Sequence, residues 1–454
     1  MSMKAVNPAT EEVIASYDEL TEDEVYAEID KAYDAFQAWK EKSFPERRDH
    51  MLKAASILRD NRTSYAKILT IEMGKPLRQA FSEVEKCAWV CEYYAENAEK
   101  ILKRENAGTD ASESYVQFDP LGVILAVMPW NFPYWQVFRF AAPSLMAGNV
   151  GLLKHSSNVP MSALAIEEVF TKAGFPQNVF KTLLVGSSMI ERIISHPKVR
   201  AATLTGSDGA GRQVASIAGR NLKKTVLELG GSDAFIVLKD ADINEAAKTA
   251  VASRIINTGQ SCIAAKRFIV VKDVIREFES KFISIVNGLK IGDPMDEQND
   301  LGPIAREDLM LELDRQVQES VKMGARLLAG GKRLGMKGFF YPATVLANVT
   351  KGMPAYEQET FGPIAAIIQA EDEEEAIRIA NDTEFGLGAN LWTTDIQRAK
   401  RLARSIEAGS IFINGMVHSD PRLPFGGVKN SGYGRELANY GIKEFVNIKT
   451  VWIA

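Results

Sequence analysis

The sequence predicts an α/β protein in which helices alternate with the strands of parallel sheets. After Gly108, short apolar runs are separated by Gly and Pro, and helical segments lie between these runs. Such alternation is typical of a parallel sheet with helices on its faces. The chain has 454 residues, more than one hydrophobic core usually supports, so two or three domains are expected.

The stretch before the first predicted strand is mostly helical. Residues 21–24 read Thr-Glu-Asp-Glu, which is typical of a capping box. Apolar residues then recur at three- and four-residue steps as far as Leu102, interrupted by Pro45 and Pro76.

The later elements follow in order along the chain. Buried strands are predicted at Val123–Met128, Val150–Leu153, Lys181–Val185 and Ala201–Leu204. Helices are predicted at Pro160–Ala173, Asp242–Ile256, Ile275–Leu289 and Arg306–Met323. A second alternating region runs from Ala234 to about Glu407, which places a domain boundary near Gly230 and Gly231. The tail up to Trp452 partly alternates, so it is predicted to be an edge strand and a candidate contact between subunits.

Composition narrows the class of function. Hydrophobic residues make up 46% and charged residues 25% of the chain, close to the average of globular proteins. A net charge of -5 offers no basic face for phosphates, so small-molecule chemistry is favoured over nucleic-acid binding. Three cysteines are too few for a disulfide framework, and no run approaches the ~18 apolar residues of a membrane helix. A cytoplasmic enzyme is therefore expected.

Two reactive side chains stand in glycine-containing segments. Cys262 follows a predicted helix in Gly259-Gln-Ser-Cys262, where a thiolate can approach a substrate closely. Glu228 interrupts an apolar strand just before Gly230 and Gly231, and a buried carboxylate there can serve as a base. Taken alone, Cys262 also fits a small buried hydrophobe, and Glu228 also fits the wet face of a strand.

Two further motifs follow predicted strands, where α/β folds build their sites. Asn131, within residues 129–133 (Pro-Trp-Asn-Phe-Pro), has an amide that can donate to an oxyanion. Gly206 and Ser207 open a helix whose N-terminus suits a dinucleotide phosphate. Taken alone, Asn131 also fits a turn, and residues 206–207 also fit an ordinary capped turn.

Together and in this order, these motifs resemble the signature set of the aldehyde dehydrogenase superfamily. Residues 72–76 (Glu-Met-Gly-Lys-Pro), 359–363 (Glu-Thr-Phe-Gly-Pro) and 424–432 also resemble segments of that family, so the resemblance runs nearly from end to end. It implies a Rossmann-like cofactor domain at residues 1–111 and 129–229 and an α/β catalytic domain at residues 230–435. A small β element at residues 112–128 and 436–454 would bridge subunits into a homodimer or homotetramer.

The resemblance also implies the chemistry. The Cys262 thiolate would attack the aldehyde, Asn131 and the Cys262 backbone N–H would hold the oxyanion, and water deprotonated by Glu228 would hydrolyse the thioester. The implied cofactor contacts are Trp130, Lys154, Ser157, Gly206, Ser207, Gly211, Leu229, Glu359 and Phe361. Members that prefer NAD often have Glu where this chain has Ser157, and a carboxylate would repel a 2′-phosphate. NADP is therefore expected to be preferred, with NAD also used.

The most similar branch is that of the succinate-semialdehyde dehydrogenases. Arg139 resembles the arginine that binds the distal carboxylate in several members, and Ser419 is expected to assist it. A second arginine of some members falls on Ile256, and Arg254, two residues away on a helix, points elsewhere. Oxidation of succinate semialdehyde to succinate is thus the predicted reaction.

Several alternatives stay open. Lactaldehyde, glyceraldehyde 3-phosphate or aliphatic aldehydes would use the same machinery. A CoA-acylating enzyme is disfavoured because that branch typically lacks the base at Glu228, and a catalytically silent protein on the same fold is the alternative of another class. The histidines show no metal-ligand spacing, so no metal is expected. Cys87 and Cys91 share one helix face and are predicted to be buried packing residues.

Overall fold

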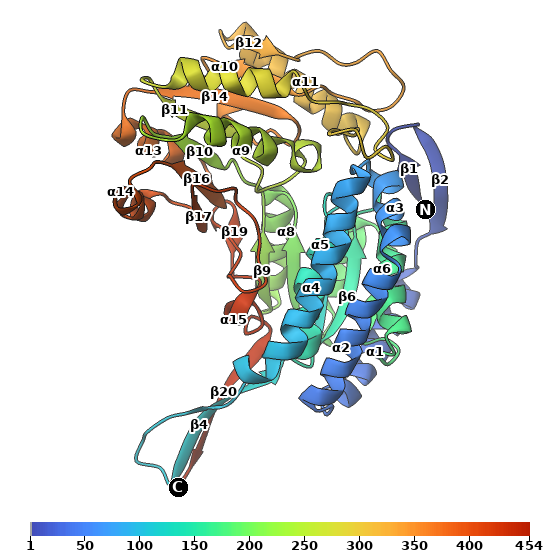
Figure 1. Cartoon of the computed structure of the whole chain (residues 1–454). Helices are drawn as coiled ribbons and strands as arrows, with labels where there is room; N and C mark the ends of the chain where they lie inside the picture. Colours follow the sequence, from blue (N-terminus) through green and yellow to red (C-terminus); the bar gives the residue numbers. More distant parts are fainter. Residues whose placement is uncertain (1) are drawn as a thin grey trace.

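Two large sheets form the framework of the computed structural model, which describes residues 2–454 (Figure 1). The six-stranded sheet, in the lower half of Figure 1, has the order β19 (Gly432–Tyr433), β9 (Lys224–Glu228), β8 (Val199–Thr205), β5 (Val123–Met128), β6 (Val150–His155) and β7 (Phe180–Thr182). The five strands from β9 to β7 pair in parallel with one another, and β19 pairs with β9 in the antiparallel sense.

The seven-stranded sheet lies in the upper half of Figure 1. Its order is β12 (Arg326–Ala329), β13 (Thr344–Ala347), β14 (Ile364–Ala370), β11 (Arg267–Val271), β10 (Ala234–Val237), β16 (Gly388–Trp392) and β17 (Ser410–Ile413). All neighbours are parallel except β12 and β13. Separate apolar clusters cover its two faces, as expected for a parallel sheet buried on both sides.

Helices cover both sheets. The helices of the first half are α1 (Glu22–Trp39), α2 (Phe44–Asp60), α3 (Arg62–Met73), α4 (Leu77–Ile101), α5 (Trp135–Met146), α6 (Pro160–Lys172), α7 (Ile190–Ser195) and α8 (Asp208–Arg220). Those of the second half are α9 (Ile243–Ile255), α10 (Ile275–Val286), α11 (Glu307–Lys322), α12 (Pro354–Glu357), α13 (Glu373–Asn381), α14 (Ile396–Leu402) and α15 (Ala438–Gly441). The predicted capping box at Thr21 starts α1, and α4 packs against α2, α3 and α5.

Smaller strands complete the fold. They are β1 (Ser2–Asn7) with β2 (Glu12–Asp18), β15 (Phe385–Gly386) with β18 (Val428–Lys429), and an arm of β3 (Glu105–Asn106), β4 (Glu113–Pro120) and β20 (Val446–Ile453). In Figure 1 this arm projects from the lower end of the molecule and carries the C-terminus. β20 is at its edge, which confirms the edge strand predicted for the tail.

The bridging element expected at residues 112–128 divides between two sheets. β4 belongs to the arm, but Val123–Met128 forms β5 in the middle of the six-stranded sheet. The expectation for this half was wrong because five of the six β5 residues are buried, and such a strand needs neighbours and cover on both faces. The strand expected at Lys181–Val185 is shorter and ends at Thr182.

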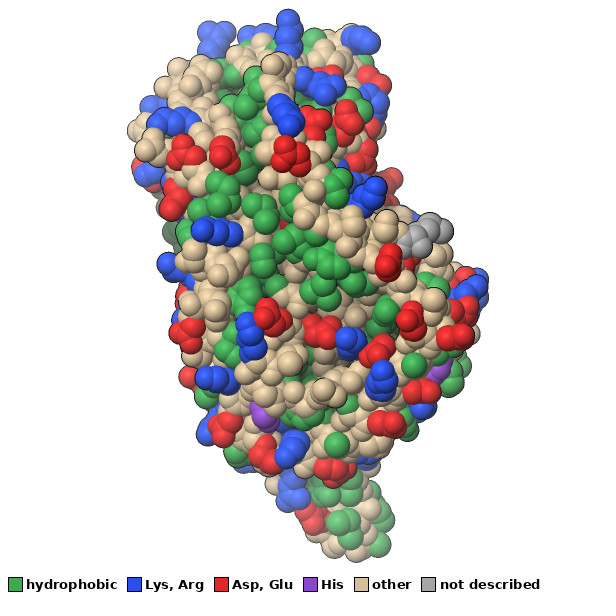
Figure 2. Space-filling view, turned by 90° about the vertical axis from the view of Figure 1, so that its right-hand side faces the viewer, with side chains coloured by type: hydrophobic (Ala, Val, Ile, Leu, Met, Phe, Trp, Pro, Cys, Tyr) green, Lys and Arg blue, Asp and Glu red, His purple; other side chains and the backbone are tan. Residues whose placement is uncertain are grey.

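The other predicted elements lie close to their expected places. The predicted helices match α6, α9, α10 and α11, although α10 ends at Val286 rather than Leu289. Cys87 and Cys91 are fully buried in α4, as predicted. Figure 2 shows acidic and basic side chains interspersed over one face of the molecule. Among residues 2–454 no helix is both long and apolar enough to cross a membrane.

Candidate active site

Four of the expected site residues lie at one edge of the six-stranded sheet. Asn131 follows β5, Ser207 follows β8, Glu228 ends β9, and Lys154 lies near the end of β6. Because β5, β6, β8 and β9 are parallel, their carboxyl ends meet at the same edge. The side chains are thereby gathered although they are far apart in the sequence.

Cys262 comes to this edge from the other half of the molecule. It follows a turn in which Asn257, Thr258 and Gly259 have φ values of 53°, 56° and 77°. Left-handed backbone is costly for side chains other than glycine, and such strain concentrates at functional sites. A Cβ at Gly259 would stand 2.3 Å from the Gly362 carbonyl, so only glycine fits there.

Hydrogen bonds tie the cysteine loop to the Asn131 loop. Asn257 Nδ2 donates to the Asn131 carbonyl at 2.7 Å, and Asn131 Nδ2 donates to the Gln260 carbonyl at 3.1 Å. Gln136 Nε2 donates to Asn131 Oδ1 at 3.1 Å, which leaves the amide NH2 facing the cysteine loop. The structure thus brings the expected oxyanion donor, Asn131, next to the loop that carries Cys262.

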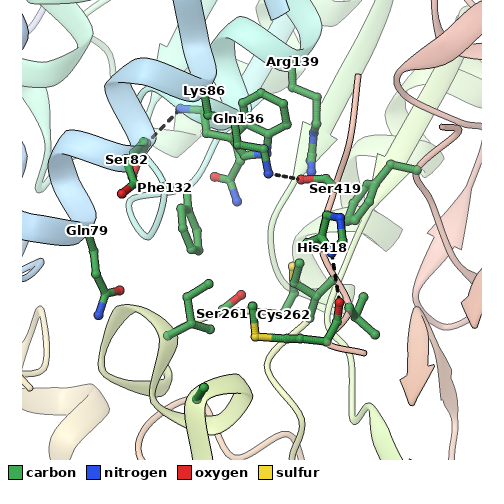
Figure 3. A pocket seen from close by; sticks show the side chains of 18 of the residues that line it. Gln79, Ser82, Lys86, Phe132, Gln136, Arg139, Ser261, Cys262, His418 and Ser419 are labelled. Carbon is green, nitrogen blue, oxygen red and sulfur yellow. Dashed lines mark hydrogen bonds between the residues drawn. The ribbon is translucent and has the colours of Figure 1, made fainter. Parts of the chain in front are cut away.

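Two cavities meet at Cys262. One of about 400 Å³ is lined by residues of α4, α5 and the chain after β17, and is shown in Figure 3. The other, of about 250 Å³, is lined by Trp130, Glu359 and Phe361 among others. Only small molecules fit such volumes. Cys262 and Gln136 line both cavities, so the thiol stands where two small ligands can meet.

The electrostatics of Cys262 are set by burial and by a buried lysine. Burial raises the pKa of the thiol to about 12, and Lys266, followed by Arg139, opposes that rise. Lys266 Nζ donates to the Cys262 carbonyl at 2.7 Å and to the Ser261 carbonyl at 3.0 Å. It also lies 3.5 Å from Glu359 Oε1. Lys266 therefore links the cysteine loop to an expected cofactor contact.

Glu228 is close to the site but lines neither cavity. It is 2% exposed, and neither carboxylate oxygen has a hydrogen-bond partner among residues 2–454. A Cβ at Gly426 would stand 2.7 Å from Glu228 Oε1, so the carboxyl group packs against that glycine. Burial, followed by the charge of Glu436, raises the pKa of Glu228 well above its usual value.

The expected cofactor contacts fall into two groups. Six of the nine line the smaller cavity around Cys262: Trp130, Gly206, Ser207, Leu229, Glu359 and Phe361. Trp130 and Phe361 meet edge to face with ring centroids 5.7 Å apart. Lys154, Ser157 and Gly211 lie outside this cavity.

Those outer residues have distinct settings. Lys154 is 9% exposed, and its pKa is lowered by burial. Ser157 is exposed in the turn after β6. Gly211 is in α8, where a Cβ would stand 2.6 Å from Leu229, so its glycine lets α8 approach the end of β9. Ser207 caps α8 as expected, accepting from the Ala210 N–H at 3.3 Å.

The larger cavity contains the expected substrate residues Arg139 and Ser419. Arg139 is 3% exposed and forms an ion pair with buried Glu436, and its Nη2 donates to Thr205 Oγ1 at 3.2 Å. Ser419 Oγ accepts from Lys86 Nζ at 2.8 Å. In Figure 3, Lys86, Arg139 and Ser419 gather in the upper part of the cavity, above Cys262.

Sequence reasoning missed several of these residues. Lys86 and Gln136 line the larger cavity, and Lys266 lies against the cysteine loop. In the sequence, Lys86 and Gln136 are ordinary polar residues of predicted helices and Lys266 directly precedes a strand, so no pattern marks them. Glu436, the partner of Arg139, follows a glycine-rich segment that carried no charge pattern. Arg254, by contrast, points away as predicted, since its Nη2 donates to the Gly259 carbonyl at 2.6 Å.

Comparison with known proteins adds a second line of evidence. The model of the aldehyde dehydrogenase family matches residues 1–451. A Synechocystis protein named "Probable succinate-semialdehyde dehydrogenase", NADP(+), is 51% identical over 454 residues, with 100% of both chains covered. An NADP(+) succinate-semialdehyde dehydrogenase of Mycobacterium avium is 52% identical over 457 residues, covering 100% of this chain and 97% of the relative. The crystal structure of succinic semialdehyde dehydrogenase from Streptococcus pyogenes in complex with NADP+ is 38% identical with a TM-score of 0.97, and 99% of each chain is covered.

Proposed function

Because the chain belongs to the aldehyde dehydrogenase family, we propose that it oxidises succinate semialdehyde to succinate with NADP as the preferred cofactor. The observation that carries this proposal is the position of Cys262 between two cavities, one with a cationic end and one at the edge of a parallel sheet. The relatives named for this reaction support the substrate, since they match over the whole chain at 51–52% identity.

The smaller cavity and the adjoining sheet edge fit a dinucleotide. Ser207 and the N-terminus of α8 would hold the pyrophosphate, Lys154 and Ser157 the adenosine ribose, and Glu359 the nicotinamide riboside. Ser157 places no negative charge beside a 2′-phosphate, which favours NADP while still allowing NAD. When bound, this cofactor supplies the acceptor for the hydride that leaves the substrate carbon.

The first half of the reaction belongs to Cys262 and Asn131. The thiol gives its proton to water in the cavity, and Cys262 Sγ then attacks the aldehyde carbon, which forms the C–S bond and places negative charge on the former carbonyl oxygen. Asn131 Nδ2, oriented by Gln136, donates to that oxygen together with the Cys262 N–H. Lys266 favours the thiolate by placing positive charge beside a thiol whose burial disfavours ionisation.

The second half belongs to Glu228. Its raised pKa suits a group that takes a proton from water, because a stronger base removes that proton more easily. The hydroxide attacks the thioester carbon, the C–S bond breaks, and the Cys262 thiolate leaves with the acid as product. Glu228 packs against Gly426 and lines neither cavity, so its side chain has to rotate toward the thioester for this step.

The decisive experiment is reduction of NADP and of NAD by the purified protein. The aldehydes compared are succinate semialdehyde, butanal, lactaldehyde and glyceraldehyde 3-phosphate, with and without CoA. We expect kcat/KM for succinate semialdehyde to exceed that for butanal by at least about 10-fold, the effect of one added charged hydrogen bond. Similar values for butanal would assign a general aldehyde dehydrogenase, and dependence on CoA would assign an acylating enzyme. Full activity in Cys262→Ala would reject Cys262 as the nucleophile.

We also propose that the protein is a homodimer or homotetramer assembled through the arm. β20 is the edge strand of that arm, and it exposes Ile448 at 62%, Trp452 at 52% and Ile453 at 45%. Exposed apolar residues on a strand edge favour pairing with another chain. Light scattering should give at least twice the 50.1 kDa mass of one chain, whereas a monomer would reject this assignment. A cytoplasmic location agrees with three free thiols.

A further inference from the structure

The larger cavity has an apolar wall and one charged end. Phe132, Trp135 and Ile255 are among its apolar residues; Phe132 precedes α5, Trp135 begins α5 and Ile255 ends α9. The charged end is formed by Lys86 of α4 and Arg139 of α5, with the Ser419 hydroxyl beside Lys86. A ligand that fills this cavity therefore has a nonpolar body and meets positive charge at one end.

Most charges around this end are already neutralised inside the protein. Arg139 is paired with Glu436, and both side chains are buried, at 3% and 6% exposure. Glu83 is paired with buried Lys75 and also accepts from the backbone N–H groups of Tyr134 and Trp135. Asp420 is bound by its neighbour Arg422, whose Nη2 lies 2.6 Å from Asp420 Oδ2.

Lys86 differs from all of these. Its Nζ donates to the neutral Ser419 hydroxyl at 2.8 Å and lies 4.3 Å from the centre of the Trp135 ring. None of the ion pairs formed among residues 2–454 includes Lys86. Lys86 is half-buried, and its ammonium group gains from an anionic partner because partial burial removes hydration that a neutral hydroxyl and a ring replace only in part.

We propose that Lys86, together with the Ser419 hydroxyl, binds the distal carboxylate of the substrate, and that Arg139 is a positioning residue whose charge is committed to Glu436. This inference rests on the proposed oxidation of a carboxylated aldehyde. It changes the role expected from the sequence, in which Arg139 supplied the binding cation. One Nζ hydrogen reaches Ser419, and the remaining ammonium hydrogens are available to a carboxylate oxygen.

The protonation of Lys86 gives an independent consequence. Burial, followed by repulsion from Arg139, lowers its pKa to about 8, while Cys87, Glu83 and Asp420 oppose that change. Cys262 and His418 are the other titratable groups that line the cavity. Above about pH 8 the empty pocket therefore loses the charge of Lys86, and a carboxylated substrate should bind less well.

The first test compares Lys86→Met with the wild type, using succinate semialdehyde and butanal at saturating NADP. A lost hydrogen bond to a charged group corresponds to about a 10- to 100-fold change. We expect kcat/KM for succinate semialdehyde to fall by that factor through KM, with butanal changed by less than about 3-fold. Lys100→Met is the matched control, since Lys100 is exposed in the last turn of the same helix. Equal kcat/KM for succinate semialdehyde in Lys86→Met and the wild type would overturn the proposal.

The second test needs no variant, so it holds even if Lys86→Met fails to fold. In the wild type, the ratio of KM for succinate semialdehyde to KM for butanal should be flat below about pH 7.5. Above about pH 8 the ratio should rise, by up to about 10-fold per pH unit, as Lys86 is deprotonated. Titration of Cys262 or Glu228 affects both aldehydes and cancels in the ratio. A ratio that stays constant to about pH 9.5 would refute the role of Lys86.

Arg139→Met separates the two cations. If Arg139 acts through Glu436, its loss disturbs the surroundings of Glu228, and kcat falls for succinate semialdehyde and butanal alike. Selective loss of succinate semialdehyde in Arg139→Met, with Lys86→Met unaffected, would assign the clamp to Arg139 instead. If the wild type does not prefer succinate semialdehyde to butanal, the proposed function itself is rejected. If the wild type has this preference and Lys86→Met keeps it, only the role of Lys86 is rejected.

Discussion

Replacing Arg139 with Met should destabilise the protein, because it leaves the Glu436 carboxyl group buried without its cation. Removal of one partner of a buried ion pair typically costs about 3–5 kcal/mol. The two side chains are 3% and 6% exposed, so water cannot take the place of the guanidinium. With an unfolding entropy of about 2.1 cal/mol/K per residue, that cost lowers Tm by about 3–5 °C in a chain of 454 residues.

The cost should also depend on pH, with a definite sign. Burial raises the pKa of Glu436, and Arg139 opposes that rise, so the variant's folded-state pKa is higher still. A folded state with a raised carboxyl pKa binds more protons than the unfolded state, whose value is about 4.3. Stability is therefore lost as the pH rises between these two values, at up to about 1.4 kcal/mol per unit. The wild-type carboxyl pKa is itself raised, so the deficit of Arg139→Met should widen as the pH rises from the folded-state pKa of Glu436 in the wild type toward its higher value in the variant.

Two control variants make this test specific. Glu436→Gln removes the titrating carboxyl group and leaves the Arg139 cation, which does not titrate in this range, so its deficit should not widen as the pH rises. The double variant Arg139→Met/Glu436→Leu removes both charges and should return to within about 1 kcal/mol of the wild type. Scanning calorimetry at one subunit concentration measures all four proteins. A deficit below about 1 kcal/mol without a pH trend in Arg139→Met would refute the reasoning.

Three further predictions concern the reaction. Ser157→Glu places a carboxylate where the 2′-phosphate is expected, so kcat/KM should fall at least about 10-fold for NADP and little for NAD in steady-state assays; equal losses would contradict this. Glu228→Gln should give a burst of one NADPH per site, followed by turnover slowed by about 100-fold or more, because the thioester persists. Slow formation of NADPH without a burst, measured by stopped-flow absorbance, would place Glu228 earlier in the reaction. Lys266→Met removes the ammonium group beside Cys262 and Glu359, so alkylation by iodoacetamide near pH 8 should slow and KM for NADP should rise; an unchanged alkylation rate would exclude an effect of Lys266 on the thiol.

Local pattern accounts for much of the predicted fold. Apolar runs bounded by Gly and Pro marked β5, β6 and β8, because parallel strands are buried on both faces and read as continuous apolar segments. The prediction of the aldehyde dehydrogenase family was confirmed by the match over residues 1–451. The misplaced segment was Val123–Met128, since a short strand does not reveal which sheet it will join.

The sequence by itself determined the alternating α/β order, and with it the edge to which Asn131, Ser207 and Glu228 are brought, because parallel strands end at the same side. Only the tertiary structure decided which charges are paired. Lys86 and Ser419 are 333 residues apart, and a lysine on a helix has the same local pattern whether it faces solvent or a cavity. Whether a cation remains free to bind a substrate depends on the partners that packing brings within a few ångströms, and Coulomb energy depends on that distance rather than on separation along the chain.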